Sequence, residues 1–114
     1  MSAELWNDWQ RDRELMKDAL EAVKRRGEEY ARAEAAYQAK KHAVAMQLEM
    51  EGTPVTQIQT VIKGDPDVNE LLYQRIAAEA RYRSSMKAVD VYRDDCRMVY
   101  DQLKRELSGD SSQY

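Results

Sequence analysis

The stretch EGTPVTQIQTVIKGDPDVNELL, residues 51–72, decides the fold, because it interrupts a sequence that is helix-forming on both sides. Both prolines and two of the four glycines fall inside it. Gly52 suits the left-handed conformation that ends many helices, Thr53 is a good N-cap, and Pro54 fits the first position of a helix. The stretch therefore predicts the end of one helix at Glu51 and the start of another at Pro54.

The middle of the stretch predicts a short amphipathic helix over residues 54–63. Val55, Ile58 and either Val61 or Ile62 recur at helical spacing and give this helix one apolar side. We expect Val55, Ile58 and Val61 to pack beneath the turn.

A second set of signals ends the short helix and starts a long one. Gly64 ends it, and Asp65 is a good N-cap for a helix that begins at Pro66. The expected organisation is one domain over residues 1–108, with helices over 3–51, 54–63 and 66–107 and a flexible tail over 109–114.

The two long segments share a seven-residue repeat. It runs through Trp9, Met16, Val23, Tyr30, Tyr37 and Val44 before the interruption, and through Val68, Arg75, Tyr82, Val89, Cys96 and Leu103 after it. Such a repeat is typical of helices packed in a left-handed supercoil. The predicted fold is all-α: a long, coiled-coil-like antiparallel helical hairpin with a short connecting helix. The two series fit a register in which Tyr30 faces Val89 and Val44 faces Arg75.

Apolar residues outside the repeat predict a partner for the hairpin. These residues are Leu71, Ile76, Val91, Met98 and Val99. Because two helices cannot bury a wide apolar face, we expect a homodimer that forms a four-helix bundle. Polar or small residues interrupt the repeat and are interpreted as places where a partner enters: Gly27, Glu34, Lys41, Arg75, Glu79 and Arg93.

The composition argues against an enzyme and against a membrane protein. The chain has 114 residues and a net charge of −3, with one histidine, His42, and one cysteine, Cys96. No zinc pattern, Cys–His pair or phosphate-binding loop is present, so we expect no catalytic residue, no metal site and no cofactor. No stretch approaches the roughly 20 apolar residues of a membrane span. A single cysteine suits a reducing compartment, and we expect a cytoplasmic protein.

Positive charge gathers in the middle of the predicted hairpin. Residues 30–48 carry an excess of two positive charges and residues 71–89 an excess of three. The candidate partner-binding residues of this basic band are Lys40, Lys41, Tyr73, Arg75, Arg81, Arg83 and Lys87. The band could bind a phosphate backbone and stack bases on its tyrosines, or it could be an ordinary solvated helix face. Both readings stay open.

Two tryptophans one turn apart form the other candidate site. Trp6 and Trp9 could anchor a partner, because tryptophan is enriched in the energetic centres of interfaces. They could instead cover the open end of the hairpin by packing against Tyr100, Leu103 and Leu107.

The segment LEMEGTPVTQIQTVIKGDPDVNELLYQRIAAEARYRSSMKAV, residues 48–89, resembles small helical proteins encoded by phages and prophages. The matching elements are Gly52, Pro54, Val55, Thr56, Lys63, Gly64, Asp65, Glu79, Ala80 and Tyr82. Members of this group are mostly of unassigned function. The resemblance implies a phage origin, and it supplies no catalytic residues.

These observations favour a non-enzymatic protein that acts by stoichiometric binding. The first expectation is a phage protein that docks on a host protein in the host cytoplasm and blocks it. An anti-defence inhibitor of the anti-CRISPR type, directed at a defence nuclease complex, is its most concrete form. The alternative is a nucleic-acid-binding accessory protein of phage recombination or replication. A purely structural coiled coil is a third possibility.

Overall fold

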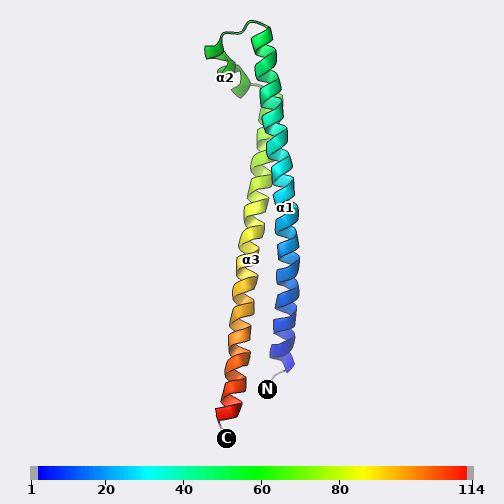
Figure 1. Cartoon of the computed structure of the whole chain (residues 1–114), viewed down its shortest axis with the longest axis vertical. Helices are drawn as coiled ribbons and strands as arrows, with labels where there is room; N and C mark the ends of the chain where they lie inside the picture. Colours follow the sequence, from blue (N-terminus) through cyan, green and yellow to red (C-terminus); the bar gives the residue numbers. More distant parts are fainter. Residues whose placement is uncertain (1–2, 113–114) are drawn as a thin grey trace. The chain divides into compact units, whose positions relative to one another are not determined.

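The computed structural model describes residues 3–112, with side chains to Gly109, and these residues form three helices (Figure 1). They are α1 (Ala3–Met50), α2 (Val55–Lys63) and α3 (Pro66–Ser112). No strand occurs between residues 3 and 112, so the all-α prediction is confirmed. Among these helices none is both long enough and apolar enough to cross a membrane.

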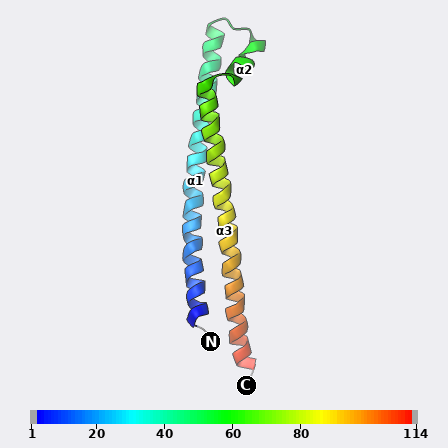
Figure 2. The same ribbon diagram turned by 180° about the vertical axis from the view of Figure 1, so that it is seen from behind.

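Contacts along the chain divide it into two compact units. Unit 1 consists of Met1–Lys24 and Arg83–Tyr114, and unit 2 consists of Arg25–Tyr82. In each unit a piece of α1 runs antiparallel beside a piece of α3, which is the predicted helical hairpin (Figures 1 and 2). The single domain expected over residues 1–108 and the dimer both stay predictions.

The end of α3 differs from the expected boundary. The helix continues to Ser112, five residues beyond Leu107, so the expected tail is helical over residues 109–112. Residues 113–114 of that tail lie outside the described residues.

The first turn of the connector is closed by backbone hydrogen bonds. Gly52 has a φ of 82°, as its left-handed role requires, and its amide donates to the carbonyl of Glu49 over 3.1 Å. The amide of Thr53 donates to the carbonyl of Leu48 over 3.0 Å. This pair of bonds is the Schellman motif, which satisfies carbonyls at the end of α1. Thr53 does not cap α2, which starts one residue later than expected, with Pro54 at the N-cap position and no side-chain cap.

The second turn confirms the prediction for Asp65. Its Oδ1 atom accepts hydrogen bonds from the amides of Asp67 and Val68, both over 2.9 Å. These are two of the four amides that a helix start leaves without a backbone partner. The Nδ2 atom of Asn69 also donates to the carbonyl of Lys63 over 3.0 Å, which ties the start of α3 to the end of α2.

The short helix α2 packs through one edge of its apolar side. Ile58 is 5% exposed and Ile62 is 2% exposed, and with Val68 they form a buried cluster. The cluster packs against Tyr37, Val44, Ala45 and Leu48 of α1. Packing of Ile58 is therefore confirmed.

Burial of the two valines of α2 is not observed. Val55 is 80% exposed and Val61 is 45% exposed. Val55 is the first residue of α2, next to a turn where Met50 is also exposed, so little of its surface is covered. Val61 is rotated by about 100° from the buried Ile62 around the helix, so it lies outside the buried cluster.

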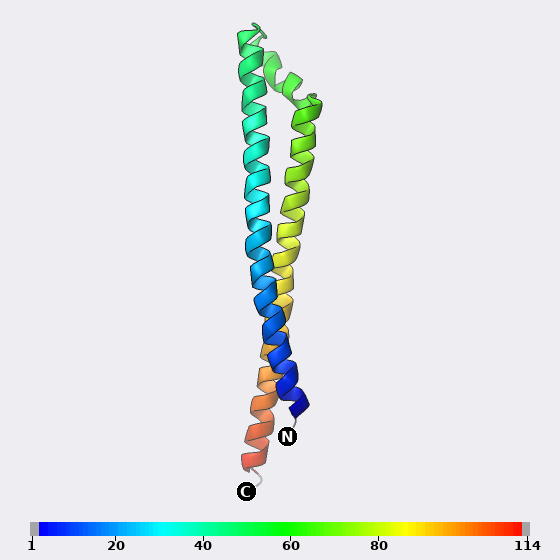
Figure 3. The same ribbon diagram turned by 90° about the vertical axis from the view of Figure 1, so that its right-hand side faces the viewer.

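The observed register differs from the predicted one by one heptad. Tyr30 faces Tyr82, with ring centroids 5.9 Å apart, and not Val89. Val44 packs against the cluster that contains Val68, and Arg75 contacts Glu34 instead of Val44. The reason is visible in Figure 3, where α2 runs back along the last turns of α1 and α3 begins below it. In a hairpin with a tight turn, the last turns of α1 would pack against α3. Here α2 packs against them, so α3 pairs with an earlier part of α1.

Candidate functional site

The candidate binding site is an apolar hollow of about 580 Å³ in unit 1. It is lined by Ala3, Trp6, Trp9, Tyr100, Leu103, Lys104 and Leu107. The rings of Trp6 and Trp9 lie 5.0 Å apart, and that of Trp9 lies 6.3 Å from Tyr100. We call this site the aromatic hollow.

Helical spacing explains how the aromatic hollow is built. Trp6 and Trp9 are three residues apart in α1, so they lie on neighbouring positions of one face. Tyr100, Leu103 and Leu107 have the same relation in α3. Leu103 is only 8% exposed and forms the floor between the helices. Trp9 packs against Tyr100 of α3, as one of the two readings expected, and Trp6 packs against Trp9.

The aromatic hollow is only partly filled by its own side chains. Trp6 and Tyr100 are each 50% exposed, and Leu107 is 54% exposed. These fractions leave large apolar surfaces in contact with water, which a protein partner could cover. Trp9 therefore packs against α3 while Trp6 presents an exposed surface, and anchoring of a partner by the tryptophans stays a prediction.

Two cations accompany the aromatic side chains. The guanidinium carbon of Arg13 lies 4.9 Å from the centre of the Trp9 ring, and Lys104 lines the aromatic hollow. A partner with an acidic group beside its apolar side chains would match this arrangement.

Sequence reasoning missed the other members of the site. Lys104 and Ala3 were not among the candidate residues. Helical spacing could have found them, because Lys104 lies four residues after Tyr100 and three before Leu107, and Ala3 lies three residues before Trp6.

The basic band is not assembled as predicted, because the register is shifted. In unit 2 residues 30–48 lie along the first part of α3, where Arg75 and Arg81 are outnumbered by three acids: Asp67, Glu70 and Glu79. Unit 2 as a whole has eight Lys and Arg residues against nine Asp and Glu residues. Arg83 and Lys87 belong to unit 1.

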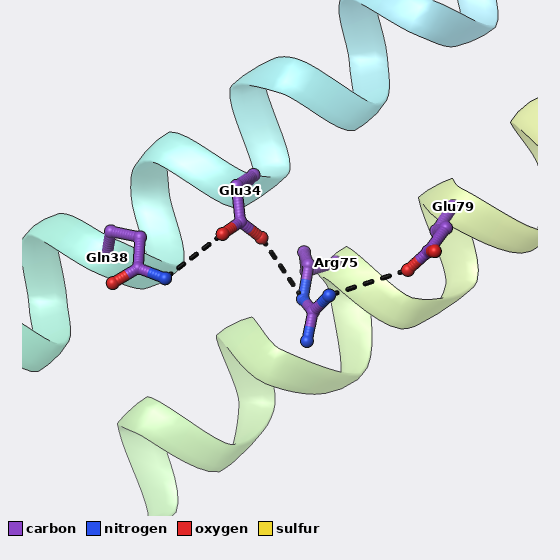
Figure 4. Close-up of polar contacts among 4 residues, drawn as sticks. All are labelled: Glu34, Gln38, Arg75 and Glu79. Atoms are coloured by element: carbon purple, nitrogen blue, oxygen red, sulfur yellow. Dashed lines mark hydrogen bonds and ion pairs between the residues drawn. The ribbon is translucent and has the colours of Figure 1, made fainter.

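Arg75 is occupied by carboxylates of the protein itself (Figure 4). Its Nε atom lies 3.2 Å from Oε2 of Glu34, and its side chain donates to Oε2 of Glu79 over 3.4 Å. Its guanidinium also lies 5.6 Å from the centre of the Tyr37 ring. These contacts already use the charge that a phosphate would need.

The remaining residues of the band lie apart from Arg75. Lys41 places its ammonium 5.6 Å from the centre of the Tyr37 ring. Tyr73 and Arg81 line a groove of about 390 Å³ that also contains Glu29. Tyr73 is 68% exposed, and Lys40 is half-buried. Partner binding by these residues stays a prediction.

Over residues 3–109, no group of three or more His, Cys, Asp and Glu side chains is placed to hold a metal ion. Cys96 is buried, and burial, with Asp12 and Asp95 nearby, raises the pKa of its thiol despite the opposing charge of Arg13. A thiol with a raised pKa is a poor nucleophile at neutral pH.

Comparison with known proteins adds no relative. No protein-family model, no curated protein and no solved structure matches the chain.

Proposed function

We propose that this protein acts without catalysis, by stoichiometric binding of another protein at the aromatic hollow. The observation that carries this proposal is the hollow itself, in which two tryptophans and a tyrosine gather around a buried leucine, with Trp6 and Tyr100 half-exposed. Trp and Tyr are enriched in the energetic centres of interfaces, where they fill apolar pockets away from water.

The chemistry of the aromatic hollow selects the kind of partner. Its lining is apolar apart from Lys104, and Arg13 lies on the Trp9 ring. The best fit is an amphipathic segment of a protein, with large apolar side chains that enter the hollow and an acidic side chain that meets one of these cations.

The resemblance of residues 48–89 to phage proteins supports a host protein as this partner. In its most concrete form the proposal is an anti-defence inhibitor that occupies a surface of a host defence protein. Nucleic-acid binding receives less support, because Arg75 is already paired and the charges of unit 2 nearly balance.

The test is a tagged pull-down from bacterial host lysate, with and without nuclease, followed by titration of the purified partner. Trp6→Ala combined with Leu107→Ala removes two half-exposed walls of the aromatic hollow. Met98→Ala is the matched control, because Met98 is a 68% exposed apolar residue of the same unit outside the hollow.

We expect a 1:1 complex that survives nuclease, weakens at least tenfold in the double variant and is unchanged by Met98→Ala. Equal binding by all three proteins would exclude the aromatic hollow as the contact. A loss of captured material on nuclease treatment would favour nucleic acid as the partner.

A further inference from the structure

In unit 2, Gly27 and Glu34 of α1 lie against residues of α3 that are complementary to them in size and in charge. A Cβ atom added to Gly27 would lie 3.2 Å from Cε1 of Tyr82, so the absence of a side chain at Gly27 makes room for this ring. Glu34, seven residues on, lies against Arg75, seven residues before Tyr82. The two contacts are therefore one heptad apart on both helices.

The contact between Glu34 and Arg75 is a partly buried ion pair, and each of the two side chains has one further polar partner (Figure 4). The Oε2 atom of Glu34 and the Nε atom of Arg75 are both buried, and they lie 3.2 Å apart without hydrogen-bond geometry. Gln38 donates to the other oxygen of Glu34 over 3.0 Å. Since this carboxylate is held in place, the position of Arg75 along α1 is well defined.

A hairpin shifted by one heptad would lose both contacts. If α3 moved seven residues towards the end of α1, Arg75 would meet Lys41 in place of Glu34, and Tyr82 would meet Glu34 in place of Gly27. A shift in the other direction would place Arg75 against Gly27, a position that itself carries no carboxylate. Removing a partly buried charge from its partner is costly, and a like charge increases that cost.

We propose that Gly27, Glu34, Arg75 and Tyr82 form a register lock, which selects one of several heptad-related pairings of α1 with α3. The apolar residues of the seven-residue repeat select this register only weakly, because the repeat matches itself after a shift of seven residues. Some positions between the two helices, such as Ala33 and Ala78, also carry small side chains, which discriminate weakly between registers. A polar contact among apolar seam residues contributes little to stability but is well suited to fixing register.

The test measures the distance between spin labels at residues 35 and 80, both exposed and both in unit 2, by pulsed electron resonance. The labels are attached to Ala35→Cys and Ala80→Cys in a Cys96→Ser background. The labelled protein with the register lock unchanged should give one distance. Exchanging the charges, with Glu34→Lys and Lys41→Glu together, offers Arg75 a carboxylate one heptad further on.

We expect the exchange to produce a second population in which α3 is displaced along α1 by about 10 Å, seven residues at 1.5 Å each. A folded exchange variant with the single original distance would overturn the proposal and show that the connector alone sets the register.

A milder matched pair keeps the proposal testable if the exchange variant does not fold. Glu34→Gln removes the carboxylate that reaches Arg75 across the helices, and Glu79→Gln removes the one within α3. Only Glu34→Gln should broaden or split the distance distribution, because a contact within one helix cannot report its position along the other. The same response from both variants, including no response from either, would refute the lock.

Discussion

Unit 2 and unit 1 are built from the same two helices but are closed in different ways. In unit 2, α2 supplies Ile58 and Ile62 as a third layer, which buries Val68 against α1. Unit 1 has only the two helices, and its buried apolar residues are Ala19, Cys96 and Leu103.

The consequence for unit 1 is a large apolar surface. Its exposed large apolar residues are Trp6, Leu15, Leu20, Met86, Val91, Met98, Tyr100 and Leu107. Two helices with a seven-residue repeat therefore form a hairpin but leave apolar side chains exposed. A third element is needed to complete a core. Unit 2 carries this element within the chain, although Met46, Met50, Val55, Val61, Tyr73 and Ile76 of unit 2 are also exposed. Unit 1 is the part that we propose obtains such an element from a partner.

The largest expected effect comes from placing a charge in the third layer of unit 2. Ile58→Asp should lower the free energy of unfolding by about 3 kcal/mol and the melting temperature by roughly 10 °C, because a buried carboxylate lacks a partner. Thermal unfolding followed by circular dichroism measures the change. Val55→Asp, in the same helix at an 80% exposed position, should change little. Equal melting temperatures for the two variants would show that α2 is not packed.

The next largest loss of stability is expected from the few buried apolar residues of unit 1. Leu103→Ala should reduce the free energy of unfolding by about 2 kcal/mol, at the lower end for buried leucines, because few neighbours surround the side chain. Urea titration gives this value. Leu107→Ala, at a 54% exposed position, is the control and should cost less than half as much. The reverse order would mean that Leu107 and not Leu103 forms the floor of the aromatic hollow.

Loss of the cap at the start of α3 should have a smaller effect. Asp65→Ala removes two hydrogen bonds to helix amides and should cost about 1 kcal/mol in chemical unfolding. Asp65→Asn keeps an oxygen acceptor and should recover most of this loss. If the asparagine variant were as unstable as the alanine variant, the charge at the helix start would matter more than the cap.

An exposed apolar residue of unit 1 should hardly contribute to the stability of the isolated chain. Met98→Lys should change the free energy of unfolding by less than about 0.5 kcal/mol at protein concentrations low enough to keep the chain monomeric. Unfolding experiments over a range of concentrations test this. A loss that grows with protein concentration would show that a second copy covers Met98.

The smallest effect concerns the pH dependence of Cys96. Its raised pKa means that the folded state favours the protonated thiol, so this contribution to stability is full below the ordinary pKa of 9.0 and is lost as the pH rises above it. Alkylation by iodoacetamide should be several-fold slower in the folded protein than in urea at pH 8–9. Equal rates in the two states would show that the thiol is accessible and unperturbed.

Local signals were predictable from the sequence, and the pairing of distant segments was not. Gly52 and Asp65 act through neighbours within a few residues, so their types and positions are sufficient to predict both turns. The register depends on how far α2 runs back along α1, and a repeat of seven gives no information on that distance. The expected pairing of the two basic segments was wrong for the same reason, since it required Val44 to face Arg75, whereas Arg75 contacts Glu34. Partner binding by the residues of the basic band stays a prediction.

The candidate site was predicted in part. The spacing of Trp6 and Trp9, with Leu103 on the repeat of α3, indicated that these side chains meet. That Trp6 stays half-exposed depends on the volume left between the helices, which the order of residue types does not specify.

The backward course of α2 also predicts the order in which the chain folds. It brings Val44 and Val68 together across about 25 residues, whereas Trp9 and Tyr100 are about 90 residues apart. Closing a short loop costs less chain entropy than closing a long one, so contacts around α2 should form first. The hairpin would then close from its turn towards the chain termini, and the aromatic hollow would be the last part to assemble and the first to open.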